Sequence, residues 1–159
     1  MPVNPDDFRA ALSRFPSGIT VVTSRGSAGD LHGITVSAFS SVSLAPPLIL
    51  VCIERTTGSH DAIKESGVFV VNILAAGQDE MSDRFSLPVA DKFNGTDYRV
   101  GIGGVPVLTD ALVSLECRLE DVFPGGDHSI FVGIVDKTSI RDGEPLVYFH
   151  GNYRGLLDS

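Results

Sequence analysis

Short runs of β-branched, aliphatic and aromatic residues, separated by glycine, proline, serine and aspartate, make up most of the chain after a helical start. The runs that predict strands are 19–24, 31–39, 48–53, 68–74, 113–120, 129–137 and 146–149. Many short strands at this spacing, with few helices between them, are typical of a closed or partly closed antiparallel barrel. We therefore expect a mainly β fold, a β-barrel with a few short helices.

Three of these runs carry a more specific expectation. Residues 48–53 are apolar on both faces, which predicts a central strand covered on each side. Residues 113–120 alternate, with Val113 and its apolar partners facing inward and Ser114 and Glu116 facing solvent. After a turn at 124–127, the run 129–137 returns with its isoleucines and Val132 on one face.

The helices are predicted from their ends. Asn4 as N-cap and Pro5 at the first helical position begin a short helix, whose apolar face we expect to dock on the body. That face consists of Phe8, Ala11, Leu12 and Phe15. Further helices are predicted over 59–66, closed by Gly67, and over 78–85. The polar, glycine-rich stretch 88–104 predicts a long functional loop.

Length and charge narrow the class of protein. The 159 residues are enough for one domain, 1–159, with a core of its own. The net charge is −8 and the basic residues form no stripe, so nucleic acid is not an expected partner. No apolar stretch is long enough for a membrane span, and the acidic start does not resemble a signal peptide, so we expect a cytoplasmic protein.

Standard catalytic and metal-binding motifs are missing from the sequence. It contains no GxSxG, HExxH, P-loop or helix-opening GxGxxG, and Gly101-Ile102-Gly103-Gly104 lacks the strand and helix of a dinucleotide loop. Cys52 and Cys117 have no CxxC or CxxH spacing, so we expect buried free thiols and no metal site.

One long stretch carries a resemblance to a known family. Residues 33–53 read GITVSAFSSVSLAPPLILVCI, which resembles the flavin reductase family, the reductase components of two-component flavin-dependent monooxygenases. The resemblance extends to Phe15-Pro16-Ser17-Gly18, to 69–74, to Gly126-Asp127-His128, and to 146–149 with Tyr153-Arg154. It therefore covers nearly the whole chain and implies an FMN-binding split barrel, a Greek-key antiparallel barrel.

A flavin needs a flat apolar slot, hydrogen-bond partners along its ring edge and a phosphate cradle. Small hydroxyls and accessible backbone amides follow one strand and the turn after it, and these are the first expected cofactor contacts: Thr35, Val36, Ser37, Ala38 and Ser41. Read without the resemblance, serine and threonine here would only decorate the outer face of a strand. By resemblance, Cys52 and Ile53 lie against the cofactor.

The segment Glu54 to His60 leads into a predicted helix, so its hydroxyls and the free amides of the helix start form a phosphate site. Thr57 and Ser59 are the expected contacts, although Ser59 could be only an N-cap. The two roles are compatible, because an anion binds where the positive end of the helix is free.

Four further residues are assigned by resemblance. His128, after its Gly-Asp turn, is expected beside the nicotinamide as the catalytic residue, against the alternative of a solvated surface histidine. Tyr153 and Arg154 are expected near the flavin or nicotinamide, or else as a packed C-terminal anchor. Phe85 is either a core aromatic or a ring-stacking residue. His32 is expected to be an exposed strand residue.

The resemblance implies an NAD(P)H:flavin oxidoreductase that works as a homodimer and supplies reduced FMN or FAD to a partner monooxygenase. Hydride transfer from NADH or NADPH to flavin needs no protein acid or base, consistent with the missing catalytic motifs. The alternatives are a non-catalytic flavin-binding electron carrier or storage protein, a barrel of the pyridoxamine-phosphate-oxidase kind, and a β-barrel interaction domain without flavin. The sequence does not distinguish FMN from FAD or NADH from NADPH.

Overall fold

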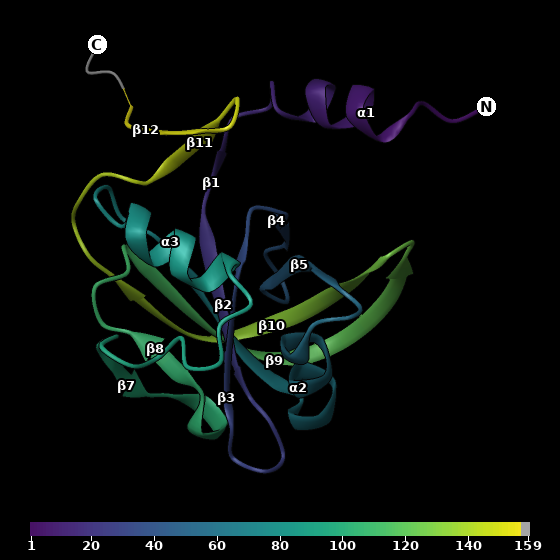
Figure 1. The fold of residues 1–159 in the computed structure, drawn as a ribbon. Coiled ribbons are helices and arrows are strands. Elements are labelled where there is room, and N and C mark those ends of the chain that lie inside the picture. The colour runs from purple at the N-terminus through teal and green to yellow at the C-terminus, as the bar shows by residue number, and fades with distance from the viewer. Residues whose placement is uncertain (157–159) are drawn as a thin grey trace.

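The computed structural model describes residues 1–156, and β-strands dominate it as the sequence patterns predict (Figure 1). The strands are β1 (Ser17–Gly18), β2 (Thr20–Arg25), β3 (Leu31–Val36), β4 (Phe39–Ser43), β5 (Leu48–Glu54), β6 (Val68–Ile73), β7 (Tyr98–Val100), β8 (Pro106–Leu108), β9 (Val113–Gly125), β10 (His128–Ile140), β11 (Val147–Phe149) and β12 (Asn152–Arg154). The helices are α1 (Pro5–Leu12), α2 (Gly58–Ser66), α3 (Asp79–Ser86) and a 3-10 turn, η1 (Ile102–Gly104). The mainly β, antiparallel fold class is confirmed.

The order of strands in the main sheet explains its shape. Seven antiparallel strands follow the order β3-β2-β6-β9-β10-β5-β4, so β3 and β4 are its two edges. These two edges are consecutive in the chain, with only Ser37 and Ala38 between them. Val36 and Phe39 are three Cα–Cα steps apart, at most about 11 Å, so the sheet must curl until its edges approach each other. The predicted strand 31–39 is therefore two strands, which meet at the open seam of a barrel.

The inner face of the curled sheet holds the main core. Val22, Val51, Phe69 and Phe131 are fully buried there and contact one another across β2, β5, β6 and β10. A Cβ on Gly133 would lie 2.5 Å from the Phe69 ring, so glycine is required for the ring to pack against β10. A second cluster, on the side of the sheet that α3 covers, is built around Phe85.

The position of β5 differs from the expectation, and the aliphatic face predicted on β10 points outward. β5 is second from an edge and its burial alternates, so the prediction of a central strand covered on both faces is wrong. On β10 the buried positions are Ser129, Phe131 and Gly133, while Ile130, Val132 and Ile134 are half-exposed. Because the large Phe131 side chain points into the core, the residues that alternate with it point outward. This aliphatic outer face is partly exposed in a single chain.

Strand β9 is also buried differently from its pattern. Ser114 and Glu116, expected to face solvent, are both only 4% exposed. The β7–β8 ribbon and the turn η1 cover this face, and the buried polar groups have partners there or on β6. The Ser114 hydroxyl donates to Oδ1 of Asn72 at 3.1 Å, and Glu116 accepts from Arg99 Nη2 at 2.9 Å and from the backbone N–H of Ile102 at 2.8 Å.

Two segments extend away from the body (Figure 1). Helix α1 begins as predicted, with Asn4 Oδ1 accepting from the backbone N–H of Asp7 at 2.9 Å, but none of its residues is buried. The expected docking face therefore contacts nothing in a single chain: Phe8, Leu12 and Phe15 are all more than half exposed. The far end of the β9–β10 hairpin also presents an exposed Phe123.

Two segments contain more regular structure than the sequence predicts. The stretch 88–104, expected to be a loop, contains β7 and η1 in its second half. After β11, the chain turns back and adds β12, which pairs Tyr153 with Tyr148. Within residues 1–156, no helix is both long and apolar enough to cross a membrane.

Candidate functional site

A groove lies at the seam where β3 and β5 face each other. Its volume is about 300 Å³. Its lining comes from the end of β3 and the connection to β4, from the end of β5, from α3 and from the start of β10, and consists of Ile34, Thr35, Val36, Ser37, Ala38, Cys52, Ile53, Glu54, Ser86 and His128. Seven of the thirteen residues expected from the sequence to form the site thus meet in one groove, although they come from three separate stretches of chain.

The outer edge of β3 provides free backbone hydrogen-bonding groups to this groove. In the described chain β3 pairs only with β2, and the carbonyl of Gly33 on its free edge accepts from Lys92. Backbone groups alternate sides along an antiparallel strand. The N–H and C=O of Thr35, two residues after Gly33, therefore point to the same free edge as the Gly33 carbonyl. The Thr35 hydroxyl donates to the carbonyl of Ser82 in α3 at 2.6 Å, which fixes the helix against the strand. Its backbone, more than its hydroxyl, is thus available to a ligand.

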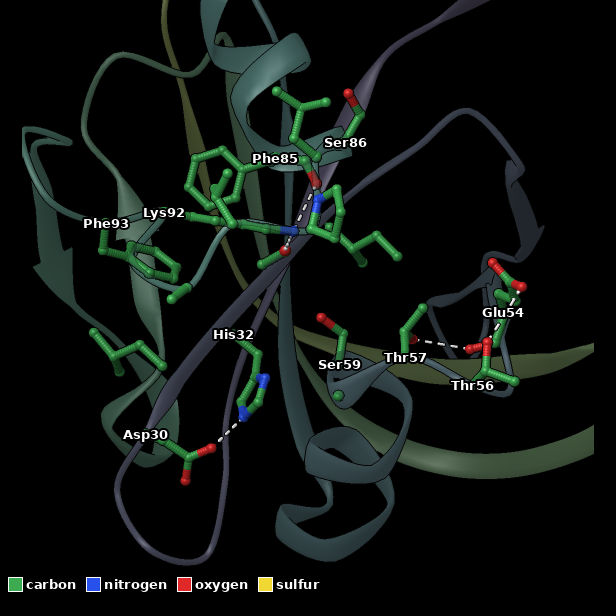
Figure 2. Close-up of a pocket in the computed structure, with 18 residues that line it drawn as sticks. Asp30, His32, Glu54, Thr56, Thr57, Ser59, Phe85, Ser86, Lys92 and Phe93 are labelled. Carbon is green, nitrogen blue, oxygen red and sulfur yellow. Dashed lines mark hydrogen bonds and ion pairs between the residues drawn. The ribbon is translucent and has the colours of Figure 1, made fainter.

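A larger cavity of about 640 Å³ continues from the groove, with Ile34, Glu54 and Ser86 lining both (Figure 2). Its walls are β3, the β5–α2 connection, the end of α3 and the segment 87–93. Phe85 is fully buried and packs edge-on against Phe93 at 5.1 Å between ring centroids. Phe85 is thus a core aromatic that also forms part of the cavity wall, and its stacking on a ligand ring stays a prediction.

The start of α2 supplies hydrogen-bond donors to this cavity. Thr57, not Ser59, is the N-cap: its side chain accepts from the backbone N–H of His60 and donates to the carbonyl of Glu54 at 2.9 Å. The helix begins one residue earlier than predicted, at Gly58, because the threonine takes the capping position. Ser59 is left inside the first turn with its side chain against the cavity. Both expected hydroxyls are therefore present, but Thr57 caps the helix and Ser59 lines the cavity.

His128 lies at the other end of the groove, at the start of β10 and opposite Glu54 in the register of β5. Its Nδ1 is 2.7 Å from Oδ1 of Asp127, and this hydrogen bond lowers the pKa of the Asp127 carboxyl. A carboxylate that accepts from Nδ1 leaves Nε2 free for a ligand. The imidazole is therefore oriented at the mouth of the groove.

Three of the expected contacts line neither the groove nor the larger cavity. Ser41 is exposed on β4, and the Arg154 guanidinium lies over the Phe149 ring at 5.2 Å. Tyr153 packs behind α3, where its hydroxyl lies 2.9 Å from Ser82 Oγ and 2.5 Å from Asp83 Oδ1. Burial and the hydrogen bond with Asp83 raise the pKa of Tyr153. In a single chain, the anchoring alternative describes Tyr153 better.

Sequence reasoning missed three charged or titratable residues that line these spaces. His32 was expected to be an exposed strand residue, but it is half-buried, bonds Asp30 and lies against Gly58. Glu54 lines both spaces, and Lys92 lies in the stretch 88–104, which was predicted to be a long loop. A lysine beside Phe93 in a polar stretch was the one signal available for that residue.

The two cysteines have different environments. Cys117 is fully buried, and burial raises its pKa to about 12. Cys52 was expected to be buried, but it is half-exposed because it lines the groove, and its partial burial raises its pKa. Among residues 1–156, no group of histidine, cysteine and carboxylate side chains is arranged to hold a metal ion.

Comparison with known proteins agrees with this geometry. The sequence profile described as "Flavin reductase like domain" matches residues 12–157. The chain belongs to the flavin reductase-like family. The resemblance seen in residues 33–53 is thereby confirmed, and it extends over both spaces of the site.

Two curated relatives and one solved structure illustrate the likeness. A "Probable flavin reductase" of Rhizobium meliloti (strain 1021) is 36% identical over 94% of this chain and 48% of its own length, so this chain spans about half of that protein. HsaB of Rhodococcus jostii (strain RHA1), named as the reductase subunit of a flavin-dependent monooxygenase, is 39% identical over 97% of this chain and 79% of that one. The NADH:FAD oxidoreductase SgcE6 of Streptomyces globisporus C-1027, solved with NAD and FAD fragments, is 33% identical with a TM-score of 0.91, covering 99% of this chain and 97% of that one.

A flavin, the group that this family implies, matches the chemistry of the two spaces. The free edge of β3 offers backbone donors and acceptors for a heterocyclic ring edge, and Cys52 and Ile53 give an apolar wall opposite. The adjoining cavity has a helix start and hydroxyls suited to a phosphate. The residues present therefore fit the group.

Proposed function

We propose that this protein is an NAD(P)H-dependent flavin reductase. The observation that carries the proposal is the groove at the sheet seam, which joins free strand-edge backbone, an apolar wall and an oriented histidine in one space. The family relatives named as NADH:FAD oxidoreductase and as monooxygenase reductase subunit support the reaction. When bound, the flavin supplies the chemistry by accepting a hydride from the nicotinamide.

The work of the chain is then binding and orientation. The backbone of residues 35–38 would hold the polar edge of the flavin ring, and Cys52 and Ile53 would provide an apolar surface for it. The start of α2 holds the phosphate. His128, held by Asp127, orients the nicotinamide over the ring by a hydrogen bond or ring contact and transfers no proton.

The reduced flavin is passed to a partner oxygenase, as the naming of HsaB suggests by analogy. The protein acts as a homodimer in this proposal, because exposed apolar side chains on α1 and on the β9–β10 tip need cover. Its compartment is the cytoplasm, since Cys52 and Cys117 are free thiols and such thiols persist under reducing conditions.

The test of the reaction is steady-state oxidation of NADH and of NADPH by the purified protein, with FMN, FAD or no flavin, each in the presence and absence of EDTA. We expect turnover only with flavin and no effect of the chelator. Flavin binding without turnover would instead favour the electron carrier or storage protein. Activity lost on chelation and restored by a metal would refute the flavin-only mechanism.

The test of the assembly is the mass in solution by light scattering, measured across a dilution series with activity in the same samples. The proposal predicts a dimer mass wherever activity is found. A fully active monomer would contradict it. Charge placed on the exposed apolar segment just after α1, as in Phe15→Glu, should weaken the dimer because Phe15 is 76% exposed in one chain.

A further inference from the structure

The buried face of α2 carries a histidine that the proposed function does not use. His60 lies in the first turn of the helix, is 5% exposed, and packs edge-on against Phe131 at 5.0 Å between ring centroids. Its Nε2 is 2.8 Å from Oγ of Ser129, and its Nδ1 is 3.3 Å from Oδ1 of Asp61. A carboxylate only accepts, so the proton of the neutral imidazole lies on Nδ1 and Nε2 accepts from the Ser129 hydroxyl. A polar pair is thus buried between α2 and the start of β10.

The contacts Asp61–His60–Ser129 have the connectivity of a hydrolytic triad, but their position excludes that chemistry. Ser129 is 6% exposed and belongs to the inward-facing side of β10 together with Phe131. Neither His60 nor Ser129 lines the groove or the larger cavity. A substrate carbonyl therefore has no access to the serine oxygen, and the role left to the hydrogen bond is to hold together the two segments that it joins.

Both segments border His128. Ser129 follows it directly, and successive side chains of a strand point to opposite faces, so a Ser129 fixed in the core directs His128 outward to the groove. On the other side of His128, the carbonyl of Asp127 accepts from the backbone N–H of Arg55 at 3.0 Å. The two sequence neighbours of His128 are thus each bonded to the segment 55–60, which leads into α2 and forms its first turn.

His128 needs this support because of its place in the strand. It is the first residue of β10, directly after the turn, and 41% of its side chain is exposed. A side chain at a strand end has few neighbours of its own, so its orientation depends on the bonds of adjacent residues. A displacement of about 1 Å in a group that orients a substrate can cost about a hundredfold in rate.

We infer that His60 is a positioning residue: through the Ser129 hydroxyl it fixes the start of β10 to the first turn of α2, and it thereby holds His128 in the orientation that receives the nicotinamide. The inference rests on the proposed function and adds to it a residue that lines neither space of the site. Loss of the hydrogen bond should therefore slow flavin reduction by its effect on His128, with flavin affinity retained.

Three variants separate the hydrogen bond from the packing of the ring. His60→Phe keeps a ring against Phe131 and removes the bond, and Ser129→Ala removes it from the other side. His60→Gln keeps a side-chain amide within reach of the hydroxyl. All three retain the backbone N–H of residue 60, which donates to Thr57 Oγ1, so the cap of α2 is unchanged.

The measurement is stopped-flow reduction of FMN at subsaturating NADH, beside the FMN Kd from fluorescence quenching. We expect His60→Phe and Ser129→Ala to slow reduction about three- to tenfold, the range for one lost hydrogen bond, and His60→Gln to stay within about twofold of wild type. The FMN Kd should change less than about twofold in all three. Ser114→Ala is the matched control, because it removes an equally buried hydroxyl, bonded to Asn72 at 3.1 Å, outside the site; it should lower the melting temperature without slowing reduction.

The decisive result is the dependence on His128. Because His60 acts through it, His60→Phe should add no further slowing to His128→Ala. Full multiplication of the two effects would overturn the inference, since that is the behaviour of a merely structural histidine. If His60→Phe does not fold, Ser129→Ala enters the same cycle with the same two outcomes.

Two other results separate this inference from the proposed function. Wild type that reduces FMN with NADH while Ser129→Ala or His128→Ala reduces it equally fast would refute the inference and leave the reductase activity standing. Wild type that does not reduce flavin with NADH or NADPH would refute the proposed function, and this inference with it.

Discussion

The backbone of β3 closely approaches the Phe85 ring at Gly33, and this approach can be tested directly. A Cβ at this position would lie 2.5 Å from Cε1 and 2.6 Å from Cδ1 of Phe85, and 3.3 Å from Cζ of Phe93. Non-bonded carbons prefer about 3.5–4.0 Å, so Gly33→Ala requires the Phe85 ring to move by about 1 Å. The ring is fully buried beside Leu74 and Leu108, so it can retreat only toward the cavity.

Overpacking of this kind costs about 1–3 kcal/mol. For a chain of this length, we expect Gly33→Ala to lower the melting temperature by about 2–12 °C and to weaken flavin binding, because the cavity wall shifts. Gly18→Ala is the matched control, since its Cβ would meet nothing within 4 Å and its φ is not positive.

The double variant Gly33→Ala, Phe85→Leu should recover part of the lost stability, because leucine leaves room for the added methyl group. Thermal unfolding of the four proteins in the cycle gives a coupling energy, expected at about 0.5–3 kcal/mol. A Gly33→Ala protein as stable as Gly18→Ala, with no coupling to position 85, would show that the described approach of α3 to β3 is incorrect.

Three further predictions concern other parts of the molecule. His128→Ala should slow flavin reduction and raise the KM for NADH by about ten- to a hundredfold in combination, with flavin Kd and melting temperature close to wild type; unchanged stopped-flow kinetics would remove this histidine from the site. A thiol reagent should label Cys52 slowly, and bound FMN should block that labelling. Cys117 should stay unlabelled in the native protein. Labelling of Cys52 at the same rate with saturating FMN would contradict its position in the groove. Burial opposes ionisation of Glu116, but its hydrogen bonds from Arg99 and a backbone N–H outweigh burial and lower its pKa. The stability that Glu116 contributes is therefore present at neutral pH and is lost as the pH falls through that lowered pKa. Glu116→Gln should therefore unfold more easily at neutral pH and show a flatter acid limb in pH-dependent melting; an unchanged acid limb would refute this role.

The pattern of the sequence was enough to predict the long strands and the three α-helices, but not the short strands β1, β7, β8 and β12. Strand runs, the Asn4 cap and the helix closed by Gly67 all depend on neighbouring residues, and all are present. The turn predicted at 124–127 is present but shorter, because β9 extends through Gly125. The groove residues 35–38 were predicted by resemblance, and their backbone exposure follows from the edge position of β3. Contact of these residues with a flavin stays a prediction.

The predictions that failed concern the burial of strand and helix faces, which depends on residues far away in the sequence. Glu116 alternates as a solvent-facing residue, but a ribbon that precedes β9 in the chain folds over it. Phe8 and Leu12 have a docking pattern, but both stay more than half exposed in one chain, so the pattern alone did not show what covers them. Lys92 was missed for a similar reason: its two carbonyl partners come from β3 and α3, and no local pattern joins three segments.

Anaerobic stopped-flow mixing of NADH with the protein and FMN, followed by the loss of the flavin's visible absorbance, tests the central claim most directly. The account predicts rapid bleaching that saturates with NADH, that is slowed in His128→Ala, and that is unaffected by EDTA. Bleaching no faster than in buffer without protein, with FMN and FAD alike, would contradict it.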